Sequence, residues 1–513
     1  MFPGIFAQKT PGKPAVIASD SGSAMSYREL DDQSAAIAAE LYARGLRRGD
    51  TIAMLADNIN EVFAIYWAAI RSGLYITPIN SHLAPAEVAY IVDDCQARAL
   101  FVSAALEELA LAIAGLTPAV EHRVVVGGTL EGHVPYRDVI ETSAPRLTDQ
   151  PRGSDMLYSS GTTGRPKGIR PSLPSTQVDE PGDPIVTMMA QFFGIGDTDI
   201  YLQPAPAYHA APLKWAAAVQ ALGGTVVQMP KFDAENALAA IAKYQVTLAQ
   251  FVPTMFVRML QLDESVRHRY DLSSLQMAVH AAAPCPPDVK QAMIDWWGPI
   301  LFEYYSASEQ HGLYMISTQE WLERPGSVGR RGLGTAHACD ESGVELPAGK
   351  VGTIYFERDV VPFSYHRDPE KTAKAIHPTH PTWTTVGDLG YLDDEGYLYL
   401  AERQDFVVIS GGVNIYPQEV ENALTLHDKI FDVAVIGVPD AEMGQRVKAV
   451  IQLKDGVEPS SELVEDILAC ARERVAGFKV PREIEFVDEI PRTATGKILK
   501  RKLMQDSDQE VEV

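Results

Sequence analysis

The sequence has few cysteines, few positive charges for its size and no long apolar run. Its four cysteines are widely spaced and form no Cys-x-x-Cys pair, which argues against a disulfide framework or a zinc site and favours reduced thiols. The apolar stretch 62–70 is among the longest, well short of the roughly 18 residues that a membrane span requires. The first six residues, Met-Phe-Pro-Gly-Ile-Phe, lack the charged and apolar regions of a signal peptide. We therefore expect a cytoplasmic protein without a membrane span.

The charge balance excludes one class of partner. Lys and Arg number 44 against 68 Asp and Glu, which gives a net charge of −24. A general nucleic-acid-binding protein would need a basic face, so we expect no nucleic acid partner. An anionic cofactor stays compatible with this total, because it responds to a local patch of charge.

Strand and helix patterns alternate along the first three hundred residues. Helical patterns over 27–44 and 60–72 each end before a glycine, and apolar strands are expected over 51–55 and 75–79. Further strands are expected at 225–229, 246–252, 276–282 and 300–305. This alternation predicts right-handed crossovers and a doubly wound, mostly parallel sheet, in which ligands bind beyond the carboxyl ends of the strands.

The predicted secondary-structure pattern changes twice after that region. From about residue 325 turns and hairpins dominate, which indicates a β-rich subdomain. After Arg403 a new α+β pattern begins, with helices expected over 417–427 and 460–474. We therefore predict an α/β protein with a large N-terminal domain over residues 1–404 and a small, mobile α+β C-terminal domain over residues 405–513. The acidic tail 506–513 is expected to lack structure.

One stretch, Tyr-Ser-Ser-Gly-Thr-Thr-Gly-Arg-Pro-Lys-Gly at 158–168, has a composition unsuited to a packed helix or strand. Its glycines allow a tight turn with backbone N–H groups free to face a ligand, and its hydroxyls and Lys167 suit phosphate oxygens. A solvated Gly/Ser linker is the alternative, and a Walker loop is excluded because Pro166 precedes Lys167. The expected phosphate loop consists of Ser159, Ser160, Gly161, Thr162, Thr163, Gly164 and Lys167.

Other short segments carry side chains suited to chemistry. They are Pro-Ala-Tyr-His at 206–209, His-Ala-Ala-Ala-Pro at 280–284, Tyr-Tyr-Ser-Ala-Ser-Glu at 304–309, Gly-Asp at 387–388, Glu-Arg-Gln-Asp at 402–405, Ser-Gly-Gly at 410–412 and Pro-Arg-Thr-Ala-Thr-Gly-Lys at 491–497. Each alone has an ordinary structural alternative, such as a buried core histidine, a plain strand, a turn aspartate or a solvated lysine.

Taken with the loop at 158–168, these segments resemble, in their order, the motifs of the adenylate-forming superfamily. That superfamily includes acyl-CoA synthetases, peptide-synthetase adenylation domains and firefly-type luciferases. The resemblance covers nearly the whole chain. The departures are that Ala281, Ser306 and Glu402 replace glycines, while Ser308 and Val386 replace threonines.

The resemblance implies a ligase that consumes ATP, with Mg²⁺, and coenzyme A. A carboxylic acid would first form an acyl-adenylate with release of pyrophosphate, and CoA would then displace AMP. Lys497 would bind the substrate carboxylate and the α-phosphate, and Glu309 with Thr162 would hold Mg²⁺. The carboxylate of Asp388 would accept the ribose hydroxyls, and His209 is a further catalytic candidate.

The same resemblance assigns the remaining nucleotide and CoA contacts. Tyr305 would stack on adenine, Ser308 would bond the α-phosphate, and Arg403 would reach the ribose. Asp405 would be the pivot about which the small domain swings between the two steps. The other expected nucleotide- or CoA-binding residues are Ala282, Ala283, Glu303, Tyr304, Ser306, Ser410, Gly411 and Gly412.

The identity of the acid stays open at this stage. Amino-acid-activating members hold the substrate ammonium with an Asp in the segment at 206–209, and none is present here, which favours a plain carboxylic acid. The expected pocket wall consists of Tyr208, His209, Phe251, His280, Ala281 and Ala282. It would suit a fatty acid, an aryl acid or a bulky alicyclic acid equally.

Two alternative functions stay open beside CoA ligation, as does homodimerisation. The adenylate could pass to a carrier-protein thiol, in which case free CoA would not support turnover. The chain could instead be a non-catalytic nucleotide-binding protein. The presence of Lys497, Glu309 and Asp388 argues against that alternative, because a binding module would not need all three.

Overall fold

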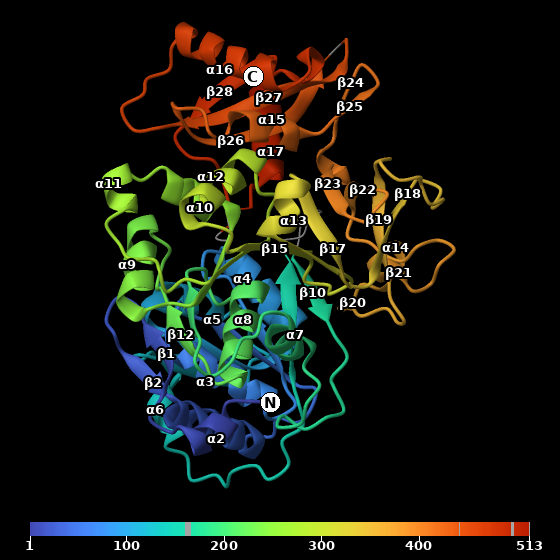
Figure 1. The fold of residues 1–513 in the computed structure, drawn as a ribbon. Coiled ribbons are helices and arrows are strands. Elements are labelled where there is room, and N and C mark those ends of the chain that lie inside the picture. The colour runs from blue at the N-terminus through green and yellow to red at the C-terminus, as the bar shows by residue number, and fades with distance from the viewer. Residues whose placement is uncertain (160–165, 441, 494–496, 512–513) are drawn as a thin grey trace. The chain divides into compact units, whose positions relative to one another are not determined.

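The structure is a computed structural model that describes residues 1–159, 166–440, 442–493 and 497–511 (Figure 1). The chain divides into two compact units. The first comprises residues 1–250, 262–278 and 362–372, and the second comprises residues 251–261, 279–361 and 373–513. The predicted domain boundary between residues 404 and 405 lies inside the second unit and stays a prediction.

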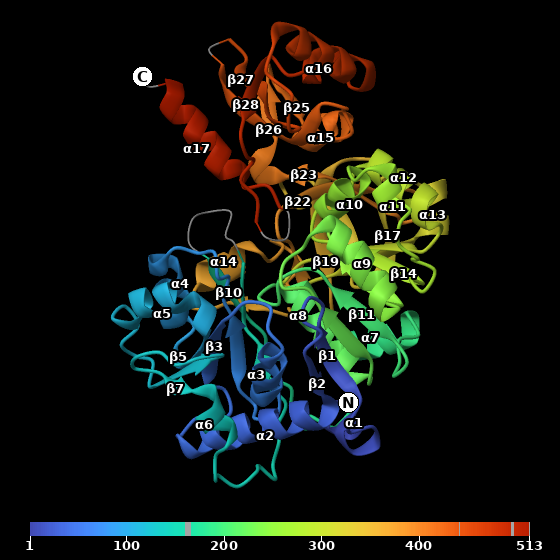
Figure 2. The same cartoon turned by 90° about the vertical axis from the view of Figure 1, so that its left-hand side faces the viewer.

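The first unit contains a six-stranded parallel sheet in the order β7-β6-β5-β3-β4-β8. Its strands are β3 (Thr51–Leu55), β4 (Tyr75–Pro78), β5 (Ala97–Ser103), β6 (His122–Val126), β7 (Val134–Pro135) and β8 (Ser154–Asp155). The helix α3 (Glu61–Ile70) lies alongside β3 in Figure 2, and all of its residues after Glu61 are buried. A helix that is apolar on every side belongs in a core, and here it covers the sheet.

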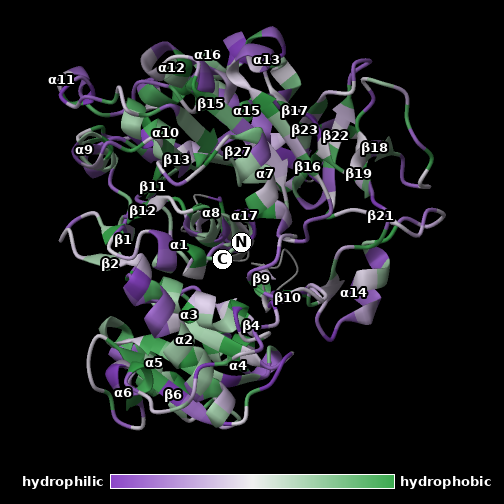
Figure 3. Cartoon of the chain, turned by 60° about the horizontal axis from the view of Figure 1, so that its bottom comes forward, coloured by the Kyte–Doolittle hydropathy of each residue, from purple (hydrophilic) through white to green (hydrophobic). Residues whose placement is uncertain are grey.

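A second set of strands in this unit follows the order β13-β11-β12-β1-β2. The strands are β1 (Pro14–Ala18), β2 (Ala24–Ser26), β11 (Ile200–Gln203), β12 (Thr225–Gln228) and β13 (Leu248–Phe251). The strand β12 pairs in parallel with β1 and β11, and β11 pairs in parallel with β13, whereas β1 and β2 are antiparallel. Figure 3 shows mainly hydrophobic colour along α8 (Ala210–Ala221), which is largely buried, and polar colour on α11 (Glu264–Arg267).

Local sequence signals account for where the helices begin. The helix α2 (Tyr27–Ala43) starts with a capping box, in which the Ser26 hydroxyl accepts from the N–H of Glu29 and the Glu29 carboxylate accepts from the N–H of Ser26. In α9 (Ala234–Tyr244) the Asp233 side chain accepts from the N–H of Asn236.

The second unit contains an antiparallel sheet in the order β18-β19-β22-β23-β17-β16-β15. Its strands are β15 (Leu301–Ser306), β16 (Leu313–Ser317), β17 (Ser327–Leu333), β18 (Thr335–Cys339), β19 (Gly352–Glu357), β22 (Asp388–Leu392) and β23 (Leu398–Arg403). Apart from β15 and β16, these strands form the β-rich region that the hairpin signals predict.

The last part of the second unit is an α+β arrangement, as predicted. Its strands follow the order β25-β24-β27-β26, with β28 parallel to β27. The elements are β24 (Val408–Ser410), β25 (Val413–Ile415), α15 (Pro417–Leu424), β26 (Ile430–Asp440), β27 (Gly444–Leu453), α16 (Ser461–Arg474), β28 (Glu483–Val487) and α17 (Lys500–Val511). The predicted fold class, α/β with a β-rich region and a C-terminal α+β part, is confirmed.

The expectation that the acidic tail lacks structure is wrong for its described part. The helix α17 continues to Val511. Leu503 of this helix is buried in a cluster with Val438 and Ile490, and Lys448 Nζ donates to Ser507 Oγ at 3.2 Å. These tertiary contacts anchor a helix whose acidic composition gives no local sign of them.

None of the helices within residues 1–159, 166–440, 442–493 and 497–511 combines the length and the apolar character needed to cross a membrane.

Candidate active site

The predicted phosphate loop joins two paired strands of the first unit. The strands β9 (Leu157–Ser159) and β10 (Lys167–Arg170) are antiparallel, and Ser159 lies opposite Lys167. Ser160, Gly161, Thr162, Thr163 and Gly164 lie outside the described residues, so their predicted roles stay predictions.

Close packing fixes the base of this loop. A Cβ at Gly168 would lie 2.8 Å from Met156 Cε and 2.9 Å from Tyr158 Cζ, so only glycine fits without a shift. The Tyr158 hydroxyl donates to Asp94 Oδ2 at 2.5 Å, and Lys167 Nζ lies 5.6 Å from the centroid of the Tyr365 ring. These contacts hold the two ends of the loop in place.

Tyr208 and His209 lie together in the first unit, at the start of α8. Their ring centroids are 4.6 Å apart, and His209 is the residue before the first helical turn. Burial lowers the pKa of His209 to about 4, so the imidazole is neutral at pH 7. Within the described part of the chain, His209 Nε2 and the Tyr208 hydroxyl are buried without a hydrogen-bond partner. Both can therefore bond a polar group of a bound molecule.

The centre of the candidate site in the second unit is the carboxylate of Asp388. Asp388 and Arg403 are register partners on β22 and β23. Arg403 Nε donates to Asp388 Oδ1 at 2.9 Å, and the Tyr305 hydroxyl donates to Asp388 Oδ2 at 2.5 Å. A carboxylate offers about four lone-pair positions, so capacity remains for two ligand hydroxyls.

The charges of this site act on one another. Burial raises the pKa of Asp388, but the positive charge of Arg403 and the two hydrogen bonds outweigh burial, and the net pKa is lowered. Burial lowers the pKa of Arg403, but the negative charge of Asp388 and its hydrogen bond outweigh burial, so the net pKa is raised. Burial and then the like charge of Arg403 lower the pKa of Lys497, while Asp388 and Glu309 oppose the change. Two carboxylates and two cations thus form one electrostatic cluster.

Two hydrogen bonds with Thr493 fix the backbone at Lys497. The N–H of Thr493 donates to the carbonyl of Lys497 at 2.8 Å, and the N–H of Lys497 donates to Thr493 Oγ1 at 3.0 Å. Residues 494–496 lie outside the described residues. Lys497 is exposed, so its charge can meet an incoming ligand.

Two short segments of the second unit lie at strand ends. Ser306, the last residue of β15, donates from Oγ to the carbonyl of Gly312 at 2.8 Å, and Glu309 beyond the strand is buried. After β14 (Met277–His280), Ala282 has a φ of 75°, a left-handed conformation that costs an L-residue about 1–2 kcal/mol. Strain of this kind is concentrated at ligand sites, and it falls on Ala282 and not on Ala281, where the resemblance leads one to expect glycine.

His280 and Phe251 are fully buried in one aromatic cluster. The ring of Phe256 lies 5.4 Å from that of His280 and 5.5 Å from that of Phe251, between centroids. Both ring nitrogens of His280 lack a hydrogen-bond partner among the described residues. The carboxylate of Glu303, which the resemblance assigns to the nucleotide, accepts from the buried Lys290 ammonium at 2.6 Å.

The glycine-rich hairpin and the predicted hinge each have their own contacts. Gly411 and Gly412 have φ values of 57° and 79°, and the N–H of Gly411 donates to the carbonyl of Met443 at 2.8 Å. Arg501 Nη2 donates to Asp405 Oδ2 at 3.0 Å, and both side chains are exposed. An exposed ion pair of this kind is weak, which suits a position expected to move.

The donors present are compatible with Mg²⁺. The described residues contain no group of three or more His, Cys, Asp or Glu side chains placed to hold a metal. Mg²⁺ usually takes only one or two protein carboxylates and completes its shell with water and substrate phosphates. The carboxylate of Glu309 would be a hard oxygen ligand of that kind, and this role stays a prediction.

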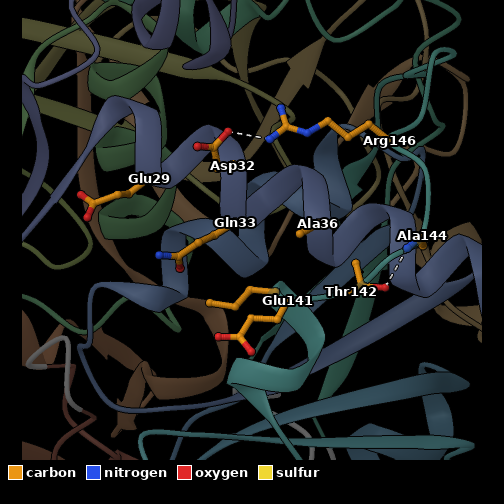
Figure 4. Close-up of a pocket in the computed structure, with 9 residues that line it drawn as sticks. Glu29, Asp32, Gln33, Ala36, Glu141, Thr142, Ala144 and Arg146 are labelled. Carbon is orange, nitrogen blue, oxygen red and sulfur yellow. Dashed lines mark hydrogen bonds and ion pairs between the residues drawn. The ribbon is translucent and has the colours of Figure 1, made fainter.

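A surface hollow of about 350 Å³ lies elsewhere, between α2 and the segment 140–146 of the first unit (Figure 4). Its polar groups are already paired: Arg146 Nη2 donates to Asp32 Oδ1 at 2.6 Å, and the Tyr136 hydroxyl donates to Gln33 Oε1 at 2.7 Å. None of the predicted site residues lines it.

Sequence reasoning missed one group of residues at the site. Glu402 and Lys500 are buried and paired, although Lys500 stands in the run Lys500-Arg501-Lys502, which looks like a solvated flank. The available signal was that Glu402 replaces a glycine beside Arg403, since a charged residue in place of glycine needs a partner if it is buried.

Comparison with known proteins is consistent with this geometry. A model of the AMP-binding enzyme family matches residues 5–365, and a model of the AMP-binding enzyme C-terminal domain matches residues 419–497. The chain belongs to this adenylate-forming family, and the prediction of an acyl-CoA synthetase is confirmed.

Individual relatives cover nearly the whole chain. The feruloyl-CoA synthase of Amycolatopsis sp is 31% identical over 93% of both chains. The 3-[(3aS,4S,7aS)-7a-methyl-1,5-dioxo-octahydro-1H-inden-4-yl]propanoyl:CoA ligase of Rhodococcus jostii is 31% identical over 94% of both chains. The crystal structure of an anthranilate CoA ligase in complex with anthranoyl-AMP superposes with a TM-score of 0.85, at 27% identity, over 100% of this chain and 98% of that one. ATP, CoA and a small carboxylic acid are the substrates that fit the family.

Proposed function

We propose that this chain joins a carboxylic acid to coenzyme A through an acyl-adenylate, with Lys497, Asp388, Arg403 and Tyr305 as the residues that hold the nucleotide. This assignment rests on the hydrogen bonds that Arg403 and Tyr305 donate to the carboxylate of Asp388. That carboxylate belongs to the same electrostatic cluster as Lys497 and Glu309. It is the donor and acceptor set that a ribose and an α-phosphate would need.

In the first step a carboxylate oxygen of the acid attacks the α-phosphorus of ATP, and the bond from that phosphorus to the bridging oxygen breaks, releasing pyrophosphate. Lys497 brings the two anions together and neutralises charge that develops on the α-phosphoryl oxygens. One such preorganised donor is worth roughly 10²–10³ in rate. Ser308 and the loop 159–167 supply further donors, and bound Mg²⁺ on Glu309 and Thr162 would neutralise phosphate charge.

In the second step the thiol of CoA loses its proton and its sulfur attacks the acyl carbon, and the bond from that carbon to the phosphate oxygen breaks, releasing AMP. The segment after Asp405 moves between the steps, so that Lys497 leaves and Ser410, Gly411 and Gly412 arrive beside the pantetheine arm. Two arrangements of one small domain let pyrophosphate depart and the thiol enter without water reaching the adenylate.

The acid pocket is assigned to Tyr208, His209, Phe251, His280, Ala281 and Ala282. The neutral His209 and His280 make this wall mixed rather than purely apolar. Aryl and alicyclic acids with polar substituents suit such a wall, and relatives named for a cinnamic-type and a polycyclic acid support including both classes.

The four free cysteines favour a cytoplasmic location, and homodimerisation is kept as a hypothesis.

The test is pyrophosphate release with octanoic, ferulic and a polycyclic alicyclic acid, each with and without CoA. We expect release with at least one acid and formation of its CoA thioester with stoichiometric AMP. Release that CoA does not turn into thioester would favour a carrier-protein thiol as acceptor. No release with any acid would contradict the proposal and favour a nucleotide-binding protein.

A further inference from the structure

Three charged side chains are buried together beside the candidate site. Lys500 Nζ lies 3.0 Å from Glu402 Oε2 and 3.0 Å from Glu421 Oε1, and the three side chains are only 7%, 9% and 5% exposed, respectively. Removing charges from water is unfavourable unless partners satisfy them, so the stability of such a cluster depends on good geometry between its members.

The hydrogen-bonding capacity of the cluster is well used. Glu402 Oε1 accepts from the N–H of Arg403 at 2.9 Å, and Glu421 Oε1 accepts from the N–H of Val435 at 2.8 Å. Burial lowers the pKa of Lys500, but the charges of Glu421 and Glu402 outweigh it, so the net pKa is raised and the ammonium stays charged. The cluster therefore joins three backbone segments through charge-assisted bonds.

Those segments carry the residues of the candidate site. Lys500 begins α17, three residues after Lys497. Glu402 lies on β23 directly before Arg403, which bonds Asp388. The Lys500–Glu402 bond thus ties the loop bearing Lys497 to the strand bearing the ribose-binding candidates.

The cluster also spans the predicted hinge. Glu402 precedes Asp405 in the chain, whereas Glu421 and Lys500 follow it. Rotation about Asp405 would break the Lys500–Glu402 bond and leave the Lys500–Glu421 bond intact, because the latter joins two helices of the same C-terminal region. One of the two bonds is therefore specific to the arrangement in the structure.

We propose that Lys500 and Glu402 are positioning residues that hold Lys497 at the nucleotide site for adenylation and separate before CoA is used. The proposal rests on the proposed function. It also gives a reason for the glutamate at position 402, where the resemblance leads one to expect glycine.

The main test is Glu402→Gln, which keeps the size of the side chain and removes its charge. A matched control is Glu465→Gln, which removes an exposed carboxylate on α16 that lies 3.7 Å from Arg472. Adenylation is measured as ATP–pyrophosphate exchange with each acid of the panel above that the parent uses. Thioester formation is measured separately from the synthetic acyl-adenylate of that acid and CoA.

We expect Glu402→Gln to lower kcat for exchange about 10-fold, because a misplaced catalytic group costs rate, with KM for ATP within about twofold of the parent. Thioester formation from the supplied adenylate should be unchanged or faster. The control should match the parent in both steps. Equal loss in both steps, or no loss in either, would overturn the proposal.

A second measurement does not depend on turnover. Hydrogen exchange of peptides covering 398–405 and 497–505 should be faster in Glu402→Gln than in the parent and in Glu465→Gln, because the bond that joins these segments is lost. Unchanged hydrogen exchange in both peptides would overturn the positioning role of the Lys500–Glu402 bond, even if no acid supports pyrophosphate release. If the parent releases no pyrophosphate but hydrogen exchange is faster in Glu402→Gln, the proposed function is wrong and the role of the Lys500–Glu402 bond in joining the two segments is retained.

Discussion

Asp388 and Arg403 face each other across β22 and β23, and Arg403 Nε donates to Asp388 Oδ1 at 2.9 Å. The pairing holds the carboxylate in a fixed orientation while the Tyr305 hydroxyl occupies its other oxygen. A carboxylate fixed in this way is a preorganised acceptor for two adjacent hydroxyls, because its orientation does not have to be established when the nucleotide binds.

The first prediction concerns this carboxylate. Asp388→Asn keeps the shape and removes the charge, and hydrogen bonds to charged groups contribute about 1.5–3 kcal/mol each. We expect kcat/KM for ATP to fall about 10- to 100-fold in pyrophosphate exchange. The matched control is Tyr391→Phe on the same strand, which should behave like the parent. An ATP dependence unchanged in Asp388→Asn would remove Asp388 from the ribose site.

The second prediction separates the two half-reactions at Lys497. Lys497→Ala removes the cation expected at the α-phosphate, so adenylation should fall by roughly 10²–10³ or more. Thioester formation from supplied acyl-adenylate and CoA should stay within about threefold of the parent, because in the proposed mechanism Lys497 has left the site before this step. The two rates are measured on the same preparations. Equal loss in both would refute the two-arrangement mechanism.

The third prediction concerns the hinge. Asp405→Pro fixes φ near about −65° and removes a backbone N–H, which restricts rotation at this position. We expect adenylation to be retained and CoA transfer to slow about 10-fold or more. Asp405→Ala is the control: it removes the exposed ion pair with Arg501 but does not restrict the backbone, so it separates the effect of the side chain from that of the hinge. Unrestricted transfer in Asp405→Pro would place the pivot elsewhere.

The sequence allowed the order of the motifs and most of the secondary structure to be predicted, because both depend on local patterns. The spacing of apolar residues predicted α2 and α3, and Gly45 and Gly73 marked the ends of these helical segments. The roles of Asp388, Arg403 and Lys497 came from the resemblance, since nothing in their immediate neighbours indicates a ribose or a phosphate.

What could not be predicted depends on contacts between distant residues. Glu402 and Lys500 are 98 positions apart, so no periodicity links them, and Lys500 stands in a basic run that is typical of solvated surface. The same applies to α17, whose acidic end is ordered by the contact of Ser507 with Lys448. Burial of a charge is decided by its partner, and the partner is visible only in the fold.

The fourth prediction concerns the base of the phosphate loop. Gly168→Ala would place a methyl 2.8 Å from Met156 Cε and 2.9 Å from Tyr158 Cζ, so the Met156 and Tyr158 side chains at the strand pair β9–β10 must shift. Overpacking of this kind costs typically about 1–3 kcal/mol, and we expect a lower thermal midpoint together with weaker ATP binding. Gly115→Ala is the control, because nothing lies within 4 Å of its added Cβ. Parent-like stability and ATP affinity in Gly168→Ala would show that the packing can yield.

The last prediction concerns acid sensitivity at His311, which is buried against the ring of Phe356 with a centroid distance of 4.8 Å. Burial lowers the pKa of His311 to about 4 in the folded state, whereas the pKa of a histidine in the unfolded chain is about 6.5. Between those values the unfolded state binds more protons than the folded state, so the free energy of unfolding falls as the pH falls through this window.

For a single group with these values the loss between pH 7.5 and pH 5 is about 2 kcal/mol. His311→Leu should therefore lose less stability than the parent over this range in urea unfolding, by about that amount, although His209 keeps part of the sensitivity because its pKa is also lowered to about 4. His268→Leu, at an exposed position, is the control and should keep the full acid sensitivity. If His311→Leu loses as much stability as the parent, His311 is not a source of the acid sensitivity.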